Sequence, residues 1–320
     1  MTGHVPGTIL VPLDGSMEAE RSASFAKALL SAGGVLILLR VIEGWESLEA
    51  NVRQEDLLEQ DIDTIAGENV QQYLNEVSSR LATADHTVRT KVMMSDPAEQ
   101  IIQAAADEAV TMVAMSTHGR GALGRVLFGS VADRVVHYNI RPTLLLRGGV
   151  DIVPVTRIIM PLDGSELAEN ALPMAIWMAR QTGALLHLVR IVDLGEILSE
   201  IRREAMQHPG ASARTQDDAY EQARIRCESV ASAYLTEFAR RMQDENVPID
   251  FEIQSGTPAF CLLDLLRSGD VMVMTTRGMG GLKRVWIGSV AEKLIRLAQV
   301  PILIVRPETL SAIETLEVSS

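Results

Sequence analysis

Short apolar runs alternate along this chain with longer segments whose apolar residues recur at helical spacing. In the first half, the apolar runs predict strands at residues 8–13, 35–42, 86–93, 111–116 and 141–147. The intervening segments predict helices at about 16–31 and 52–82, and two more that begin near 97 and 130. Strands that alternate with helices indicate right-handed crossovers and a parallel sheet covered on both faces.

The second half of the chain repeats this order of elements. Its predicted strands lie at about 157–162, 185–192, 249–254, 271–275 and 301–305. The repeat extends to single residues, because T-I-L-V-P-L-D-G-S at 8–16 returns as R-I-I-M-P-L-D-G-S at 157–165. A repeat of this length is a duplicated domain rather than a solenoid unit. About twelve additional residues of the second copy fall within 195–228.

The duplication predicts an α/β protein made of two tandem, doubly wound, five-stranded parallel sheets. We expect a first domain at residues 1–148, a linker at 149–155, a second domain at 156–307 and a tail at 308–320. In open sheets of this type, ligands bind beyond the carboxyl ends of the strands, where the strand order reverses. The first and fourth strands of each copy are expected to flank that point.

Composition narrows the classes of partner and the compartment. Of the 320 residues, 47% are hydrophobic and only 4% aromatic, and the net charge is −13. So acidic a chain lacks the cationic surface that binds nucleic acid or anionic membranes, and neither partner is expected. Cys227 and Cys261 have no metal-ligand spacing and are expected to be reduced, which favours a cytoplasmic location. The first residues do not resemble a signal peptide, and no apolar stretch is long enough to span a bilayer.

A glycine-rich loop follows the fourth strand of each copy. The segments 116–134 and 275–293 share the pattern S/T-x-x-G, nine further residues, and G-S. The glycines of the first part, Gly119 and Gly278, would let a ligand approach the backbone closely. The second part, at 129–130 and 288–289, precedes a helical pattern, where N–H groups and a serine hydroxyl favour a phosphate.

The serines of this loop also have a purely structural interpretation. Ser130 with Asp133, and Ser289 with Glu292, resemble capping boxes, in which the serine is the N-cap of the helix. A capping serine leaves other first-turn N–H groups unused, so the two interpretations are compatible.

An aspartate follows the first strand of each copy. Asp14 and Asp163 could accept hydrogen bonds from a ribose hydroxyl, or they could simply cap the first helix. No nucleophile–base pair recurs in both copies, and no histidines have metal-ligand spacing. The sequence therefore predicts no catalytic and no metal-binding residue.

Together these motifs resemble the universal stress protein family in its tandem two-domain form. The resemblance covers about residues 6–307 and rests on the glycine loop combined with the early D-G-S. It implies an adenine nucleotide alpha hydrolase-like fold in each domain, and ATP as the ligand of several members, here with or without magnesium. It also implies that the last strands, 141–147 and 301–305, pair as edge strands, making the chain an internal pseudo-dimer. The resemblance is also compatible with further dimerisation of the whole chain.

Carried over position by position, the resemblance implies two nucleotide sites. In the first copy, the residues on the adenine, ribose and phosphate sides would be Pro12, Asp14, Val41, Met115, Gly119, Gly129 and Ser130. Their equivalents in the second copy would be Pro161, Asp163, Ile191, Met274, Gly278, Gly288 and Ser289. The first glycine of the family motif is replaced by Ser116 and Thr275. Because threonine is bulkier and stiffer, the first copy is expected to bind better.

The leading hypothesis is a cytosolic, non-enzymatic protein that binds ATP in one or both domains and acts as a stress-response sensor or switch. One alternative is a stress-response interaction scaffold that binds no nucleotide. The other is a slow ATPase, which is disfavoured because no positioned general base is evident.

Overall fold

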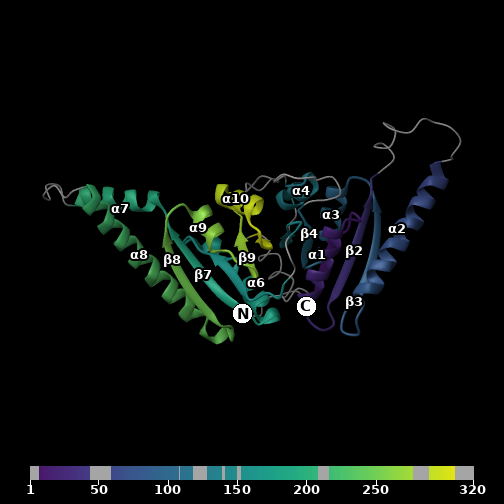
Figure 1. Ribbon diagram of the computed structural model, residues 1–320, viewed down its shortest axis with the longest axis horizontal. Coiled ribbons are helices and arrows are strands. Elements are labelled where there is room, and N and C mark those ends of the chain that lie inside the picture. Colours follow the sequence, from purple (N-terminus) through teal and green to yellow (C-terminus); the bar gives the residue numbers. More distant parts are fainter. Residues whose placement is uncertain are drawn as a thin grey trace, which may run out of the picture. The chain divides into compact units, whose positions relative to one another are not determined.

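The computed structural model describes residues 7–43, 59–107, 109–117, 128–138, 141–149, 153–207, 216–276 and 288–306, with the side chains of helix α2 from residue 68 onward (Figure 1). Within these ranges the chain forms two compact units. The first contains strands β1 to β5 and the last strand, β10, and the second contains strands β6 to β9. The two predicted series of strands are confirmed within a few residues.

The first unit is built on a parallel sheet. Its strands are β1 (Thr8–Pro12), β2 (Val35–Ile42), β3 (Thr87–Met94), β4 (Met112–Ser116) and β5 (Thr143–Leu146). They lie in the order β3-β2-β1-β4-β5 and pair in parallel. The order reverses between β1 and β4, so these two strands flank the switch point, as predicted.

Helices cover both faces of this sheet. They are α1 (Met17–Ala28), α2 (Glu59–Leu81), α3 (Pro97–Ala105) and α4 (Ser130–Tyr138). Helices α1 and α2 pack together, and so do α3 and α4. The first pair connects strands in one direction along the sheet and the second pair in the other, so right-handed crossovers put the pairs on opposite faces.

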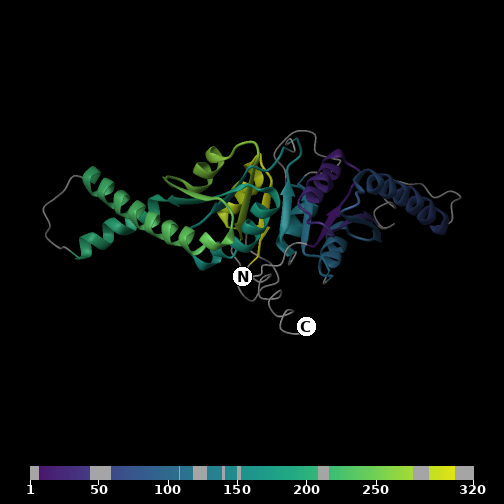
Figure 2. The same cartoon turned by 90° about the horizontal axis from the view of Figure 1, so that it is seen from below.

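The second unit repeats this plan with one addition. Its parallel strands are β6 (Arg157–Pro161), β7 (Leu185–Val192), β8 (Ile249–Ser255) and β9 (Asp270–Thr275), in the order β9-β6-β7-β8. Its helices are α5 (Glu166–Glu169), α6 (Leu172–Thr182), α7 (Leu194–Gln207), α8 (Gln216–Arg241), α9 (Pro258–Leu265), α10 (Ser289–Leu297) and the short 3-10 helix η2 (Gln243–Glu245). Helix α7 packs against α8 at an angle (Figure 2) and falls where the inserted residues were predicted.

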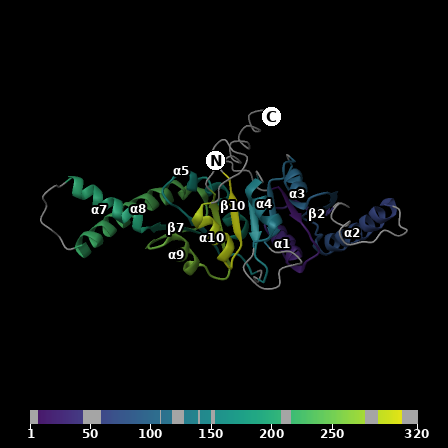
Figure 3. The ribbon, with the colours of Figure 1, turned by 90° about the horizontal axis from the view of Figure 1, so that it is seen from above.

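The last strand of the second repeat packs with the sheet of the first unit. Strand β10 (Ile302–Val305, labelled in Figure 3) is antiparallel to β5, with Ile302 opposite Leu145 and Ile304 opposite Thr143. After the strand, the buried Arg306 donates to the carbonyl oxygen of Val136 over 2.6 Å. The predicted pairing of the two edge strands is confirmed, and it covers an edge that would otherwise expose unpaired backbone groups.

The interiors of both units consist of aliphatic side chains. Strands β1, β4, β6 and β9 are buried over most of their length, which explains why they appear in the sequence as continuous apolar runs. Cys227 and Cys261 are free and half-buried. In the described part of the chain, no helix combines the length and the apolar character that crossing a membrane requires.

Candidate functional site

The D-G-S turn after β1 is held by its own aspartate. Beyond the end of the strand, the Leu13 amide donates to the carbonyl oxygen of Leu39 over 2.7 Å. One carboxylate oxygen of Asp14 then accepts hydrogen bonds from the Ser16 amide (2.9 Å) and the Ser16 hydroxyl (2.6 Å). Gly15 has a φ of +83°, a conformation that favours glycine, which explains the residue between Asp and Ser.

Ser16, and not Asp14, caps helix α1. The Ser16 hydroxyl oxygen accepts a hydrogen bond from the Ala19 amide over 3.2 Å, and Ser16 has the extended backbone of an N-cap. The alternative that Asp14 only caps the helix is therefore wrong. Asp14 lies two residues before the capping serine and accepts two hydrogen bonds from it. These bonds fix the direction of the carboxylate at the end of β1.

The second unit has the same turn. Asp163 accepts from the Ser165 amide (3.0 Å) and the Ser165 hydroxyl (2.5 Å), and the Ser165 hydroxyl accepts from the Ala168 amide over 3.2 Å. Gly164 has a φ of +84°. The two repeats thus share the hydrogen-bond pattern of the turn as well as its sequence.

An arginine from the second strand lies near each aspartate. Arg40 donates to the carbonyl oxygen of Leu13 over 2.9 Å, and Arg190 occupies the same place in β7, where it also pairs with Glu196 over 2.6 Å. Burial alone would raise the pKa of Asp163, but the hydrogen bonds from Ser165 and the charge of Arg190 lower it on balance. Asp163 is therefore ionised at neutral pH and acts as a hydrogen-bond acceptor.

A glycine brings the start of α4 against the end of β4. The Gly129 amide donates to the carbonyl oxygen of Thr117 over 2.9 Å. A Cβ atom on Gly129 would lie 3.0 Å from that oxygen, so a larger residue is accommodated only if the backbone shifts. The Thr117 amide in turn donates to Leu146 over 2.9 Å, which extends the β4–β5 pairing. The amino terminus of α4 is therefore fixed beyond the carboxyl end of β4.

The predicted capping boxes are wrong. In the second unit the N-cap of α10 is Gly288, whose carbonyl oxygen accepts from the Glu292 amide over 2.9 Å, and Ser289 is the first helical residue. In the first unit, the carbonyl oxygen of Gly129 accepts from Asp133 over 2.8 Å, and α4 begins at Ser130. Each helix begins one residue earlier than the capping boxes predict, and in the first unit this is because Gly129 lies against the end of the preceding strand.

The shifted start changes which groups can face a ligand. The Gly129 amide is already bonded to Thr117, so it is not one of the N–H groups that a phosphate would meet. The amides of residues 130–132 have no carbonyl acceptor within the helix, so their N–H groups point out of the helix start. Both serines are exposed at this point.

Sheet pairing brings most of the predicted residues to one edge of each unit. Pro12, Val41 and Met115 lie at the carboxyl ends of β1, β2 and β4, which are neighbours in the sheet. Pro161, Ile191 and Met274 have the same places in β6, β7 and β9.

Exposure differs among these residues, and two of them lie outside the described part of the chain. The side chains of Met115 and Met274 are each only 5% exposed, so a ligand would meet little of them. Gly119 and Gly278 lie outside the described residues. Among the residues that the structure does describe, no group of three or more His, Cys, Asp or Glu side chains is placed to hold a metal ion.

Sequence reasoning missed the capping serines and the arginines of the second strands. Both left a signal in the duplication. Ser16 and Ser165 occupy the same position of D-G-S, and Arg40 and Arg190 are each the sixth residue of their strand. A polar residue kept in both copies within otherwise variable segments is the mark of a shared local role.

Comparison with known proteins agrees with this geometry. The sequence profile of the universal stress protein family matches residues 7–147 and again 154–306. A universal stress protein of Mycolicibacterium smegmatis is 26% identical over 226 residues, which cover 69% of each chain. The crystal structure of a universal stress protein from Archaeoglobus fulgidus shares the fold, with a TM-score of 0.62, 22% identity, and coverage of 95% of this chain and 99% of that one. The chain therefore belongs to the universal stress protein family, with one family domain in each half.

Proposed function

We propose that this protein binds ATP, or a closely related adenine nucleotide, in one or both repeats and acts as a stress-response sensor or switch. One observation carries the proposal, and it recurs in both units. An aspartate that is hydrogen-bonded by the capping serine follows one of the two strands that flank the switch point, and a helix with glycine at its N-cap follows the other. Ligands of doubly wound sheets bind at that place.

The residues present fit a nucleotide. An ionised carboxylate at Asp14 or Asp163 accepts hydrogen bonds from ribose hydroxyls. The first-turn amides of α4 and α10, with the exposed hydroxyls of Ser130 and Ser289, present donors and a positive helix end to phosphates. Magnesium, when bound, would neutralise phosphate charge in a chain that is acidic overall.

The remaining predicted residues complete each proposed site. Pro12 and Val41 supply apolar surface beside the base in the first repeat, and Pro161 and Ile191 do so in the second, with the largely buried Met115 and Met274 on the phosphate side. Gly119 and Gly278 give room on the phosphate side.

The first repeat is proposed to bind more tightly. Ser116 and Thr275 end β4 and β9, where the family motif has glycine. The aspartates also differ, because Asp163 is more exposed than Asp14. Hydrogen bonds to a less exposed carboxylate compete less with water, which favours the first site.

Titration of the full-length protein with Mg-ATP by calorimetry tests this proposal. We expect Gly129→Glu to remove the tighter binding and Gly288→Glu the weaker, because each adds bulk and negative charge at a helix start. Gln299→Glu is the matched control, since it adds the same charge to an exposed residue just after the carboxyl end of α10. Binding that persists in the Gly129→Glu, Gly288→Glu double variant would contradict the proposal.

A second candidate function is an interaction scaffold without nucleotide. It is favoured by the bond between Gly129 and Thr117, because a loop closed on its own backbone has a structural reason to retain its glycine. Under this alternative no heat of ATP binding appears and ATP does not raise the melting temperature.

A slow ATPase would instead release phosphate at a rate that falls in both glycine variants. The leading proposal, a nucleotide-binding stress protein, also includes a cytoplasmic location and a homodimer of the chain.

A further inference from the structure

A polar motif on the long helix of each repeat is outside the site described above. Helix α2 has 23 residues, and at an offset of 161 it aligns with residues 220–242. Only four of these aligned positions are identical in the two copies: Tyr73 and Tyr234, Leu74 and Leu235, Glu76 and Glu237, Arg80 and Arg241. Both leucines are fully buried and serve packing, whereas the tyrosines and arginines are polar and need another reason to be retained.

In the second unit the tyrosine and the arginine hold one carboxylate between them. The Tyr234 hydroxyl donates to one oxygen of Glu169 over 2.9 Å, and Arg241 donates to the other oxygen over 3.2 Å. The Arg241 guanidinium also lies 4.8 Å from the centre of the Phe238 ring. Burial, and then Glu169, raise the pKa of Tyr234 above its usual range, so the phenol keeps the proton that it donates.

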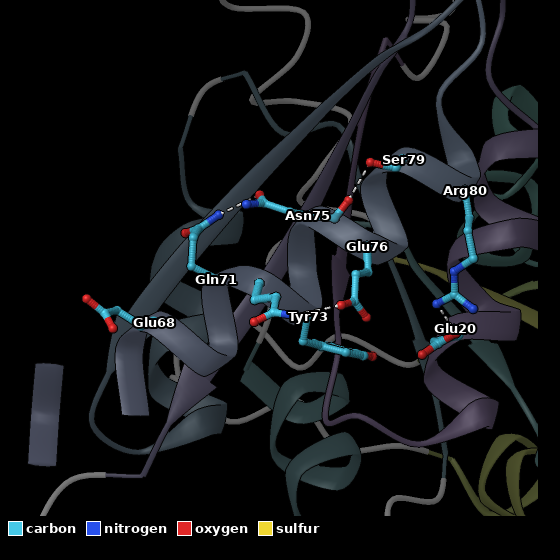
Figure 4. A pocket seen from close by; sticks show the side chains of 9 residues that line it. Glu20, Glu68, Gln71, Tyr73, Asn75, Glu76, Ser79 and Arg80 are labelled. Carbon is cyan, nitrogen blue, oxygen red and sulfur yellow. Dashed lines mark hydrogen bonds and ion pairs between the residues drawn. The ribbon is translucent and has the colours of Figure 1, made fainter. Parts of the chain in front are cut away.

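The first unit has the same residues, but only the arginine hydrogen-bonds to the carboxylate, because the buried Tyr73 hydroxyl has no hydrogen-bond partner among the described residues. Arg80 donates to Glu20 over 2.7 Å, and the Tyr73 ring points its buried hydroxyl toward the same carboxylate (Figure 4). Burial, and then Glu20, raise the pKa of Tyr73 to about 12. These side chains border an open groove of about 860 Å³ between α1 and α2. Glu20 and Glu169 occupy equivalent positions, one turn into the first helix of each repeat.

The carboxylate at the centre of each cluster is joined to the proposed ligand-binding aspartate. The Glu20 amide donates to the carbonyl oxygen of Ser16 over 3.2 Å, and the Ser16 amide and hydroxyl both donate to Asp14. In the second unit, the Glu169 amide donates to Ser165 over 3.3 Å, and Ser165 donates to Asp163. An unbroken chain of contacts thus runs from the long helix to the aspartate in both repeats.

We propose that Tyr73, Glu20 and Arg80, and likewise Tyr234, Glu169 and Arg241, form a polar clamp that positions Asp14 and Asp163 for the nucleotide. These are positioning residues, because they act through the serine and the aspartate of the D-G-S turn. The inference rests on the proposed function, and it adds that the long helix after the second strand sets the affinity of the site.

The clamp acts by restricting the first turn of the first helix. Without the tyrosine hydroxyl, Glu169 is held only by Arg241, whose side chain is half exposed, and such pairs are weak on their own. The turn then visits orientations in which Asp163 does not face the ligand. Because the apparent affinity scales with the fraction of molecules in the competent arrangement, we expect a loss of about 5- to 10-fold.

A double-mutant cycle on the full-length chain tests the clamp. In a Gly129→Glu background, so that only the second site is measured, the affinity for Mg-ATP is determined for Tyr234→Phe, Asp163→Asn and both together. If the tyrosine acts through the aspartate, the double variant binds no more weakly than Asp163→Asn alone. Tyr220→Phe is the matched control, because it makes the same change on the same helix and should leave the affinity unchanged.

The controls separate positioning from a general loss of stability. A purely structural tyrosine would lower the melting temperature and would leave the affinity of the folded protein unchanged. If Tyr234→Phe folds poorly, Arg241→Gln replaces it, with recovery of affinity expected in Arg241→Lys. Wild-type affinity in both folded variants, or an affinity loss that adds fully to that of Asp163→Asn, would overturn the clamp while leaving nucleotide binding intact. A parent that binds no ATP would overturn the proposed function and the clamp together.

Discussion

A buried ion pair at the start of β6 and β9 gives the sharpest stability prediction. Arg157 donates to both oxygens of Asp270, over 2.9 and 2.7 Å, and also to the carbonyl oxygen of Leu265. The Arg267 amide donates to Asp270 over 2.8 Å. The Asp270 side chain is 2% exposed and that of Arg157 is 17% exposed, so the pair is well shielded from water. We predict that Asp270→Ala strongly destabilises the second unit.

The magnitude follows from what the substitution leaves behind. Asp270→Ala removes the acceptor of three hydrogen bonds and leaves the Arg157 guanidinium without its hydrogen-bonded counter-ion. Removing one partner of a buried pair costs about 3–5 kcal/mol. For a unit of this size, each kcal/mol corresponds to roughly 2–4 °C, so the transition should fall by roughly 6–20 °C. The pair lies at the amino-terminal ends of the strands, away from the proposed site, so ligand affinity well below the transition should not change.

Scanning calorimetry of the full-length chain measures this shift. Glu237→Ala is the control, because its pair with Arg240 spans 2.8 Å but is exposed on both sides, and no measurable shift is expected. If the two units unfold in separate transitions, Asp270→Ala should move only one of them. A shift as small as that of Glu237→Ala would refute the reasoning that burial makes this pair essential.

Two further predictions concern the D-G-S turn and the helix starts. Ser165→Ala should cost about 1 kcal/mol of unfolding free energy because Ser165 caps α5. Ser289→Ala should cost less than about 0.5 kcal/mol because Gly288, and not Ser289, is the N-cap of α10. Equal losses of unfolding free energy in urea titrations would contradict this assignment. Since folding lowers the pKa of Asp163 below its ordinary value of 3.8, its ionised form stabilises the fold above pH 4, and this contribution is lost as the pH falls through the folded pKa. The stability gap between the parent and Asp163→Asn should therefore close below about pH 4, and a gap that stays constant from pH 6 to pH 3 would contradict the coupling.

The strands were predictable because their burial leaves a direct trace in the sequence. A strand covered on both faces, such as Ile158–Met160 within β6, must be apolar throughout. The duplication then gave each assignment an independent second reading. Pairing of β5 with β10 was expected only from the family resemblance, since neither strand carries a signal for its neighbour.

The helix starts were less predictable because they depend on contacts remote from the local pattern. Ser289 followed by Glu292 satisfies the capping-box pattern, yet Gly288 takes the N-cap position. In the first repeat, the reason is the approach of Gly129 to Thr117, twelve residues earlier, which no local rule describes. Tertiary contact here overrides a strong local preference.

The clamp residues could not be found by periodicity or spacing. Glu20 and Arg80 are 60 residues apart and partly exposed, and each alone has the character of an ordinary solvated charge. Only comparison of the two repeats singles these residues out. Only the folded structure shows that the tyrosine and the arginine of the long helix lie at one carboxylate next to the D-G-S turn. The general lesson is that an internal duplication can identify polar residues that a single copy would hide.

The most direct test of the central claim is the nucleotide content of freshly purified full-length protein. The protein is denatured, and the supernatant is analysed by chromatography and mass spectrometry. Nucleotide binding predicts released adenine nucleotide, near two per chain if both sites are filled and near one if the first repeat binds more tightly. No released nucleotide, together with no heat on titration with ATP and magnesium, would contradict the claim and make the scaffold function the better account.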